Sequence, residues 1–130
     1  MQQHIACIAL LVEDYDRAIN FYTRKLGFTL TEDTPLSTSK RWVLVTPAGS
    51  SGPALLLAKA ATEEQHSRVG NQTGGRVFLL LHTDDLDRDY RHLLQQDIRV
   101  IEGPRQELYG KVLVFEDLYG NKWDLIEKKI

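Results

Sequence analysis

Two apolar runs, each followed by an acidic turn and an Asp-Arg pair, dominate the pattern of hydrophobic and polar positions along this chain. The first extends without gaps from Cys7 to Arg17, and the second from Phe78 to Arg88. Each position in the second run lies 71 residues after its equivalent in the first. A repeat of this kind indicates two copies of one supersecondary unit.

Each apolar run is followed by a stretch whose apolar residues recur with the 3.6-residue period of a helix. Asp14 precedes the first stretch and Asp85 the second, and aspartate is a favoured helix N-cap. Gly27 closes the first helix in the manner typical of a C-terminal glycine, whereas the second ends less cleanly around Gln96-Asp97. The pattern therefore predicts a strand followed by a helix in each half.

Three short runs of β-forming residues follow each predicted helix. They cover residues 28–32, 41–46 and 54–59 in the first half, and residues 98–102, 111–116 and 122–127 in the second. Gly103-Pro104 is interpreted as the end of the strand over 98–102. Each half is thus βαβββ, and a single such sheet with one helix would leave its other face wet. We expect an α+β fold of two paired βαβββ modules, forming a curled mixed sheet around a cleft.

The whole chain is interpreted as one domain, 1–130. Module one covers about 4–60, a linker about 61–75, and module two about 76–128. The linker is polar and rich in glycine, and a helical turn is expected around residues 62–69.

The composition argues against nucleic-acid, lipid and membrane-spanning roles but does not identify a ligand or a reaction. The chain has 130 residues, 42% of them hydrophobic and 26% charged, with a formal net charge of −2. This near balance gives no basic field for nucleic acid or anionic lipid, so neither partner is expected. The apolar run over 5–12 is too short for a membrane span, and the single Cys7 cannot pair within the chain. We expect a cytoplasmic protein.

Two segments resemble those of a known superfamily. The run Val12-Glu-Asp14-Tyr-Asp-Arg17-Ala18-Ile-Asn-Phe21-Tyr22, followed by Leu26-Gly27-Phe28, resembles the opening module of vicinal oxygen chelate (VOC) proteins. These are glyoxalases, bleomycin-resistance proteins and extradiol dioxygenases. Tyr109-Gly110 and then Phe115-Glu-Asp117-Leu-Tyr-Gly120-Asn121-Lys-Trp123-Asp124-Leu125 are similar to the closing hairpin, with Leu118 where a proline is common. The resemblance implies paired βαβββ modules around a cleft.

Enzymes of this superfamily hold a divalent metal with four side chains, and the resemblance puts those positions at Cys7, Leu56, Phe78 and Asp124. Leu56 and Phe78 cannot coordinate a metal, and a site needs three or more N, O or S ligands. We therefore predict no metal and no other cofactor. A divalent metal stays open as the alternative, because no motif fixes the alignment at Leu56. Cys7 is then a small buried hydrophobe.

Strand alternation predicts which side chains line the cleft, given that the family's ligand positions face it. Alternation selects Cys7, Ala9, Phe78, Leu80 and His82 as ligand-binding residues. The resemblance adds Leu56 as a ligand position and Tyr109 at the mouth of the pocket, and Trp42 is a further aromatic candidate. For Trp42 and Tyr109 the alternative is core or rim packing, and for His82 an exposed or Asp-capped histidine.

Asp124 is the main candidate for chemistry and Glu107 a weaker one. In an apolar cleft the pKa of Asp124 would be raised, so that it could act as a base or anchor a cationic group. The alternative is a carboxylate satisfied by a backbone amide or an arginine.

Three functional hypotheses follow. The first is a metal-independent protein that binds a small, largely apolar or aromatic molecule in its cleft. The second is a small enzyme: a lyase or isomerase with Asp124 or Glu107 as base, or a metal-dependent dioxygenase or glyoxalase if the alignment is wrong. The third concerns assembly, and we expect a homodimer. Whether the protein is an enzyme stays open at this stage.

Overall fold

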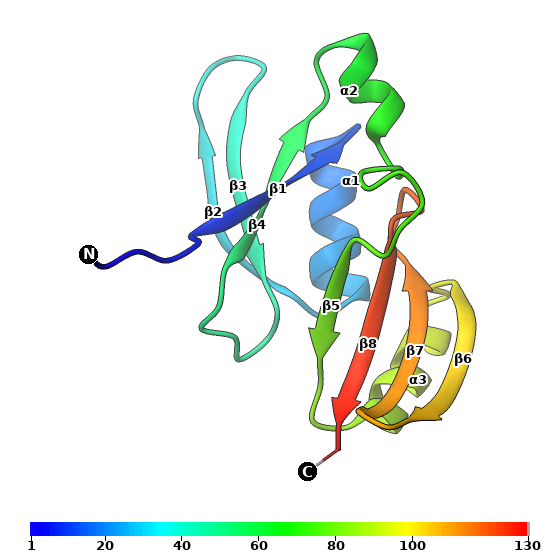
Figure 1. Ribbon diagram of the computed structural model, residues 1–130. Coiled ribbons are helices and arrows are strands. Elements are labelled where there is room, and N and C mark those ends of the chain that lie inside the picture. The colour runs from blue at the N-terminus through cyan, green and yellow to red at the C-terminus, as the bar shows by residue number, and fades with distance from the viewer. Residues whose placement is uncertain (130) are drawn as a thin grey trace. The chain divides into compact units, whose positions relative to one another are not determined.

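A computed structural model describes residues 1–129. The chain divides into two compact units, Met1–Val69 and a second that begins at Gly70 (Figure 1). Each unit contains one four-stranded mixed sheet with the order βαβββ along the chain. The predicted α+β class with two βαβββ modules is thus confirmed.

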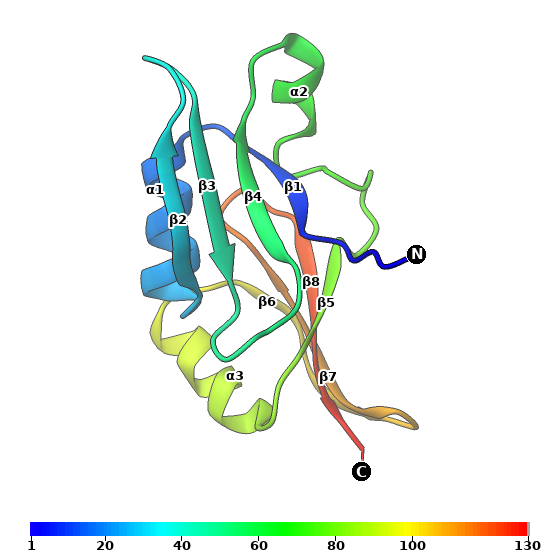
Figure 2. The ribbon, with the colours of Figure 1, turned by 90° about the vertical axis from the view of Figure 1, so that its left-hand side faces the viewer.

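The first sheet has the strand order β1-β4-β3-β2. Its strands are β1 (Cys7–Val12), β2 (Thr29–Pro35), β3 (Arg41–Thr46) and β4 (Ala54–Lys59). β1 pairs with β4 in parallel and the other neighbours are antiparallel. The helix α1 (Tyr15–Asn20), which continues as the π-helical turn η1 (Phe21–Lys25), runs along one face of this sheet (Figure 2).

The core of the first unit lies between α1 and the sheet. The core side chains of β1, β3 and β4 are fully buried, and so are the apolar residues of the helix that meet them: Leu10, Val12, Val43, Val45, Leu57, Ala18 and Tyr22. Burying one such Leu or Val side chain contributes about 1.5–3 kcal/mol. The 3.6-residue period of the helix and the two-residue period of the strands bring these residues to one layer.

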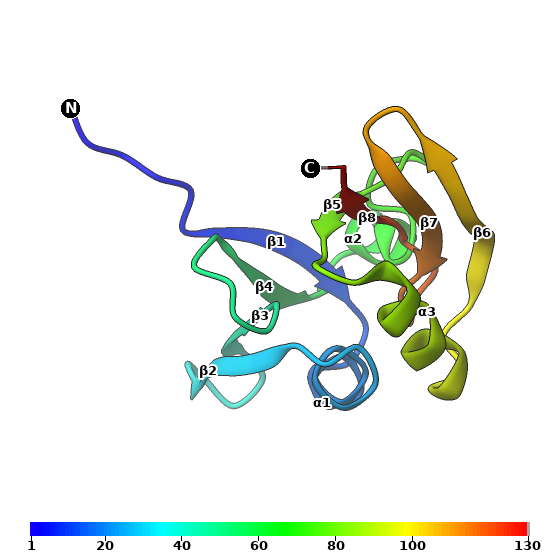
Figure 3. The ribbon, with the colours of Figure 1, turned by 90° about the horizontal axis from the view of Figure 1, so that it is seen from below.

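The second sheet has the strand order β5-β8-β7-β6. Its strands are β5 (Leu79–His82), β6 (Val100–Glu107), β7 (Gly110–Glu116) and β8 (Lys122–Lys128). β5 and β8 are parallel, and the other pairs are antiparallel. The helix α3 (Leu86–Gln95) contacts β6 and β8 and lies beside the curved strands in Figure 3. Its buried residues are Leu86 and Leu93.

Both predicted helix N-caps are present. Asp14 Oδ1 accepts a hydrogen bond from the Arg17 N–H at 2.9 Å, and Asp85 Oδ1 accepts one from the Arg88 N–H at 3.0 Å. Gly27 follows the first helix with φ of 89°. After α3 the same left-handed region is taken by Asp97, with φ of 56°. An aspartate tolerates this conformation, which explains why no glycine marks the end of the second helix.

The prediction that a strand ends at Gly103-Pro104 is wrong. β6 continues through this pair to Glu107, and its pairing with β7 shifts register between Glu102 and Arg105. β6 is an edge strand of its sheet. A proline is tolerated there because its missing N–H falls at an irregularity rather than at a ladder hydrogen bond.

The segment predicted as a linker carries structure of its own. The helix α2 (Glu63–Arg68) occupies the expected turn, with Thr62 Oγ1 accepting a hydrogen bond from the Gln65 N–H at 3.1 Å. The residues that follow are attached to the β7–β8 turn, where Asn121 Oδ1 accepts a hydrogen bond from the Gln72 N–H at 3.1 Å. A Cβ on Gly70 would lie 1.9 Å from the Tyr119 carbonyl oxygen, so this close approach requires glycine.

None of the helices within residues 1–129 combines the length and the apolar character needed to cross a membrane.

Candidate functional site

The helix α3 covers one face of the second sheet. Glu127 of β8 accepts a hydrogen bond from the Leu86 N–H of α3 at 2.9 Å, and Lys111 of β7 lies 3.3 Å from Asp87 of α3. Side chains two residues apart along a strand share a face, so Trp123 and the other residues of the same parity also lie under the helix. Asp124 therefore points to the opposite side, which we call the open face of the second sheet.

One row of residues crosses this open face. The register places Leu80 of β5 opposite Asp124 of β8, Asp124 opposite Val114 of β7, and Val114 opposite Glu102 of β6. Residues directly opposite in neighbouring strands present their side chains to the same face. Val114 is 3% exposed, whereas the Leu80 side chain is 62% exposed. The row thus has an apolar, accessible end at Leu80 and an acidic edge at Glu102.

Asp124 lies in this row without a hydrogen-bond donor of its own. Within residues 1–129 its carboxylate accepts no hydrogen bond and forms no ion pair. Partial burial raises the pKa of Asp124 above its usual range, the Arg105 guanidinium opposes this, and the Glu102 carboxylate adds to it. A carboxylate in this state can accept a proton or pair with an incoming cation.

Arg105 is held by its neighbours on β6. Its Nη1 lies 3.0 Å from Glu102 Oε1, and its Nε lies 2.9 Å from Glu107 Oε1. These bonds raise the pKa of Arg105, with Glu107 as the largest cause. The Glu107 carboxylate is therefore engaged in an ion pair, which leaves Asp124 as the better candidate for a base or anchor.

The remaining candidates of the second unit have different surroundings. His82 lies at the exposed end of β5, on the same face as Asp124 and opposite Ile126. Tyr109 is 51% exposed at the β6–β7 hairpin. Phe78 precedes β5, and its ring packs edge-on against the Trp123 ring with centroids 5.9 Å apart. The structure thus brings Leu80 and His82 to the face of Asp124, while Phe78 contributes to the packing around Trp123.

The first sheet has an equivalent open face. Ala9 of β1 lies opposite Leu56 of β4, Leu56 opposite Leu44 of β3, and Leu44 opposite Glu32 of β2. Ala9 and Leu80 are the positions related by the 71-residue repeat. Leu56 therefore occupies in the first sheet the place that Asp124 occupies in the second. The row across the first sheet is therefore apolar except for Glu32 on the edge strand β2.

Trp42 and Cys7 lie on the same open face of the first sheet. Trp42 is two residues before Leu44 and its side chain is 37% exposed. Cys7 is two residues before Ala9, is half-buried, and forms no disulfide. Both belong to the predicted ligand-binding set.

A metal centre needs a compact group of ligands. No three His, Cys, Asp or Glu residues within 1–129 come together in a group that could hold a metal ion. Of the four positions carried over from the superfamily, only Cys7 and Asp124 have side chains that coordinate metals, and they belong to different sheets.

The sequence did not reveal Glu102 and Arg105 as neighbours of the candidate acid. The predicted strand over 98–102 does not reach Arg105, whereas β6 continues to Glu107. The three-residue step from Glu102 to Arg105 also breaks strand alternation, so only the bulge puts both side chains on the open face.

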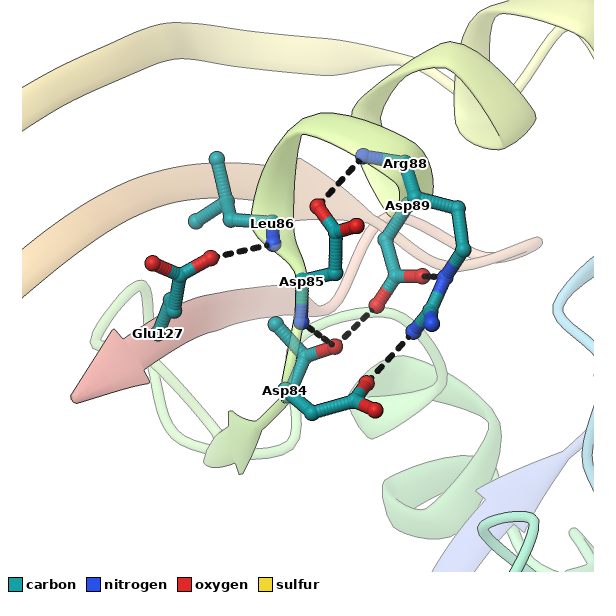
Figure 4. A network of polar contacts seen from close by, with 7 residues as sticks. Asp84, Asp85, Leu86, Arg88, Asp89 and Glu127 are labelled. Atoms are coloured by element: carbon teal, nitrogen blue, oxygen red, sulfur yellow. Dashed lines mark hydrogen bonds and ion pairs between the residues drawn. The ribbon is translucent and has the colours of Figure 1, made fainter.

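A second polar cluster lies at the start of α3 (Figure 4). Arg88 pairs with Asp84 at 2.7 Å and with Asp89 at 3.0 Å, and Thr83 Oγ1 donates a short hydrogen bond to Asp89. The Arg88–Asp84 and Thr83–Asp89 contacts join the start of the helix to the residues that follow β5, and the Arg88–Asp89 pair lies within the helix. This cluster orders the helix terminus and is not the candidate site.

Residues 3–125 match the family model described as "Glyoxalase/Bleomycin resistance protein/Dioxygenase superfamily". The chain belongs to this superfamily. The resemblance to vicinal oxygen chelate proteins is thereby confirmed over nearly the whole chain.

Individual proteins are similar to this chain in sequence and in fold. An uncharacterized protein of Shewanella frigidimarina (strain NCIMB 400) is 55% identical over 128 residues, covering 98% of this chain and 95% of the relative. Among solved structures, UcmS2 has a TM-score of 0.86 at 27% identity, covering 98% of this chain and 100% of that one. TnmS3, an antibiotic binding protein from Streptomyces sp. CB03234, has a TM-score of 0.80 at 29% identity, covering 98% of both chains.

Proposed function

We propose that this superfamily member binds a small, largely apolar or aromatic molecule on the open faces of its sheets and does so without a metal. The observation that carries the proposal is the make-up of these faces. They present accessible apolar side chains, Leu80 and Trp42, together with a single carboxylate, Asp124, that has no donor of its own. A few polar groups in apolar surroundings are typical of small-molecule sites.

The similarity to TnmS3, described as an antibiotic binding protein, supports the same class of function. The residues that we propose for ligand contact are Cys7, Ala9, Trp42 and Leu56 on the open face of the first sheet, and Leu80, His82 and Tyr109 in the second unit. Trp42 and Tyr109 can stack on an aromatic ring. Phe78 acts through its packing on Trp123.

Binding can be tested with 1-naphthalenemethanol, an uncharged aromatic probe. Titration of ¹⁵N-labelled protein should shift the amide signals of β1, β4, β5 and β8, and should change the fluorescence of Trp42. Leu80→Glu should weaken binding at least about tenfold, because it places a charge on the apolar end of the row. Leu94→Glu is the matched control, since Leu94 is 51% exposed but lies on α3. Equal loss in both variants, or no binding by the wild type, would contradict the proposal.

A second candidate function is that of a lyase or isomerase with Asp124 as general base. The raised pKa of Asp124 favours it, because a base must hold a proton after abstracting it. The hemithioacetal of methylglyoxal and glutathione is a suitable substrate to assay, with and without added Zn²⁺ or Ni²⁺. Turnover by the wild type that is lost in Asp124→Asn would favour this candidate over simple binding.

A further inference from the structure

The charges on the open face of the second sheet do not balance. Four carboxylates, Glu102, Glu107, Glu116 and Asp124, share this face with three cationic side chains, Arg105, Lys122 and Lys128. Lys128 is four residues after Asp124 and lies opposite Gly110. Arg105 already lies within 3.0 Å of both Glu102 and Glu107. Both bonds are charge-assisted and stronger than neutral hydrogen bonds, and they hold the guanidinium against the two glutamates rather than in contact with Asp124. Within residues 1–129 the Asp124 carboxylate therefore forms no hydrogen bond or ion pair, and Arg105 acts on it only through space.

The other ionisable groups of this face do not supply one. Lys122, two residues before Asp124, directs its Nζ to the Gly75 carbonyl oxygen at 3.4 Å. Glu116, opposite Lys122, lies 3.4 Å from Arg99. His82 is one row further along β5 and is exposed. No hydrogen bond or ion pair joins any of them to Asp124 within residues 1–129.

Leu80 and Val114 flank Asp124 on either side of the row. Apolar neighbours lower the local dielectric, and an opposite charge brought to this carboxylate gains more energy there than at a fully solvated position. A ligand that carries both an ammonium group and an apolar body could pair with Asp124 while covering Leu80. A neutral alcohol gains only the apolar contact, and an anion is repelled.

We propose that the open face of the second sheet selects ligands with a positively charged amine, and that the Asp124 carboxylate binds this amine directly. The inference rests on the proposed function and adds the charge of the ligand to it. Glu102 and Glu107 support this role by holding Arg105 in ion pairs of their own.

Three probes with one aromatic body test the inference: 1-naphthylmethylamine, 1-naphthalenemethanol and 1-naphthoate. Their dissociation constants are measured at neutral pH and low salt by titration calorimetry, and by amide shifts when binding is weak. The amine should bind at least about tenfold more tightly than the alcohol, and the carboxylate most weakly.

The decisive variant is Asp124→Asn, which keeps the shape of the side chain. It should bring the amine and the alcohol to nearly equal affinity and leave the affinity for the alcohol within about twofold of wild type. Asp87→Asn is the matched control. It removes the same charge from α3, on the other side of the sheet, and should preserve the preference for the amine.

A measurement on the wild type makes the test independent of how the variant folds. As pH falls, protonation of Asp124 should abolish the preference for the amine, while 1-naphthylmethylamine itself stays charged. Carboxyl ¹³C signals, assigned in parallel, identify whether Asp124, Glu102 or Glu107 titrates with this loss.

The outcomes separate the two proposals. If no probe binds, the proposed function fails and this inference with it. If the alcohol binds but the amine binds no better, or if the preference survives in Asp124→Asn, this inference is overturned and the proposed function stands.

Discussion

Glu127 of β8 and Leu86 of α3 are joined by a hydrogen bond of 2.9 Å from the backbone N–H of Leu86 to Glu127 Oε1. Leu86 is the first residue of α3, so its N–H has no partner within the helix. The carboxylate satisfies this N–H and places a negative charge at the positive end of the helix. The strand that carries Asp124 is thereby attached to the helix that covers the back of its sheet.

Glu127→Ala should lower the free energy of unfolding by about 1–2 kcal/mol, because it leaves the Leu86 N–H without an acceptor. Glu127→Gln keeps an acceptor oxygen and should cost less than half of that. Urea denaturation followed by circular dichroism measures both. Equal losses in the two variants would show that the charge, and not the hydrogen bond, carries the effect.

The helix and strand positions could be predicted from the sequence because local rules agree there. Asp14 and Asp85 cap the helices that they precede, and β3 and β4 have the predicted bounds. The prediction failed at β6, where the Gly103-Pro104 pair signals a turn locally. The pairing of β6 with β7 overrides that signal, and such pairing is not visible in a local pattern.

Asp117→Ala should destabilise the protein by about 3 kcal/mol. Asp117 is 6% exposed, and its Oδ1 accepts hydrogen bonds from the N–H groups of Tyr119, Gly120 and Asn121 at 2.9–3.0 Å. Removing the carboxylate leaves these donors without their acceptor at a buried turn. Asp117→Asn retains one oxygen and should cost about 1 kcal/mol. Thermal unfolding compares the two, and a loss in Asp117→Ala below about 1 kcal/mol would refute this account of the turn.

The candidate acid could be chosen from the sequence, but not its surroundings. Strand alternation together with the family pattern selected Asp124, and the register places Leu80 beside it. The ion pairs of Arg105 depend on which side chains the β6 bulge brings together. The spacing of residues along the sequence does not predict this bulge. Phe78 packs edge-on against Trp123, a contact that strand alternation alone does not predict.

Asp33 and Asp124 should change stability with pH in opposite directions. The hydrogen bonds from Arg41 lower the pKa of Asp33, so its contribution is present above the ordinary pKa of aspartate and is lost as pH falls below it. The pKa of Asp124 is raised, so its ionised form disfavours folding, and this penalty disappears as pH falls through that raised pKa.

The opposite directions of the two pKa shifts predict opposite effects when each aspartate is replaced by asparagine. At pH 7 Asp124→Asn should leave the melting temperature unchanged or raise it by about 1–2 °C, and Asp33→Asn should lower it by a similar amount, since Asp33 is partly exposed. At about pH 3, where an ordinary aspartate is largely protonated, both differences should shrink. Calorimetric scans between these pH values are the measurement. A fall in melting temperature for Asp124→Asn at pH 7 would show a stabilising partner for this carboxylate.

The protein should form a homodimer in solution. Accessible apolar side chains outside the open faces, among them the 95% exposed Leu108, favour association, because burying them removes apolar surface from water. Light scattering coupled to size exclusion should give about twice the 14.9 kDa mass of the chain at micromolar concentration. Leu108→Glu should shift this mass toward that of the monomer if the hairpin lies in the interface. A wild-type mass near 14.9 kDa would contradict the prediction.

Metal binding decides between the proposed function and metal-dependent glyoxalase or dioxygenase chemistry. The resemblance assigns two of the superfamily's four ligand positions to Leu56 and Phe78, and neither side chain donates an electron pair. We therefore expect Zn²⁺, Fe²⁺, Mn²⁺ and Ni²⁺ at tenfold molar excess to raise the melting temperature by less than about 1 °C. A specific site would raise it by several degrees, because a ligand that binds only the folded state stabilises in proportion to the logarithm of its concentration over Kd.

Protein purified without chelator should contain well under one metal per chain by elemental analysis. The variant Cys7→Ala is the control for adventitious binding to the thiol. A stoichiometric metal that survives in Cys7→Ala would place ligands elsewhere in the chain and would favour the enzyme over the binding protein.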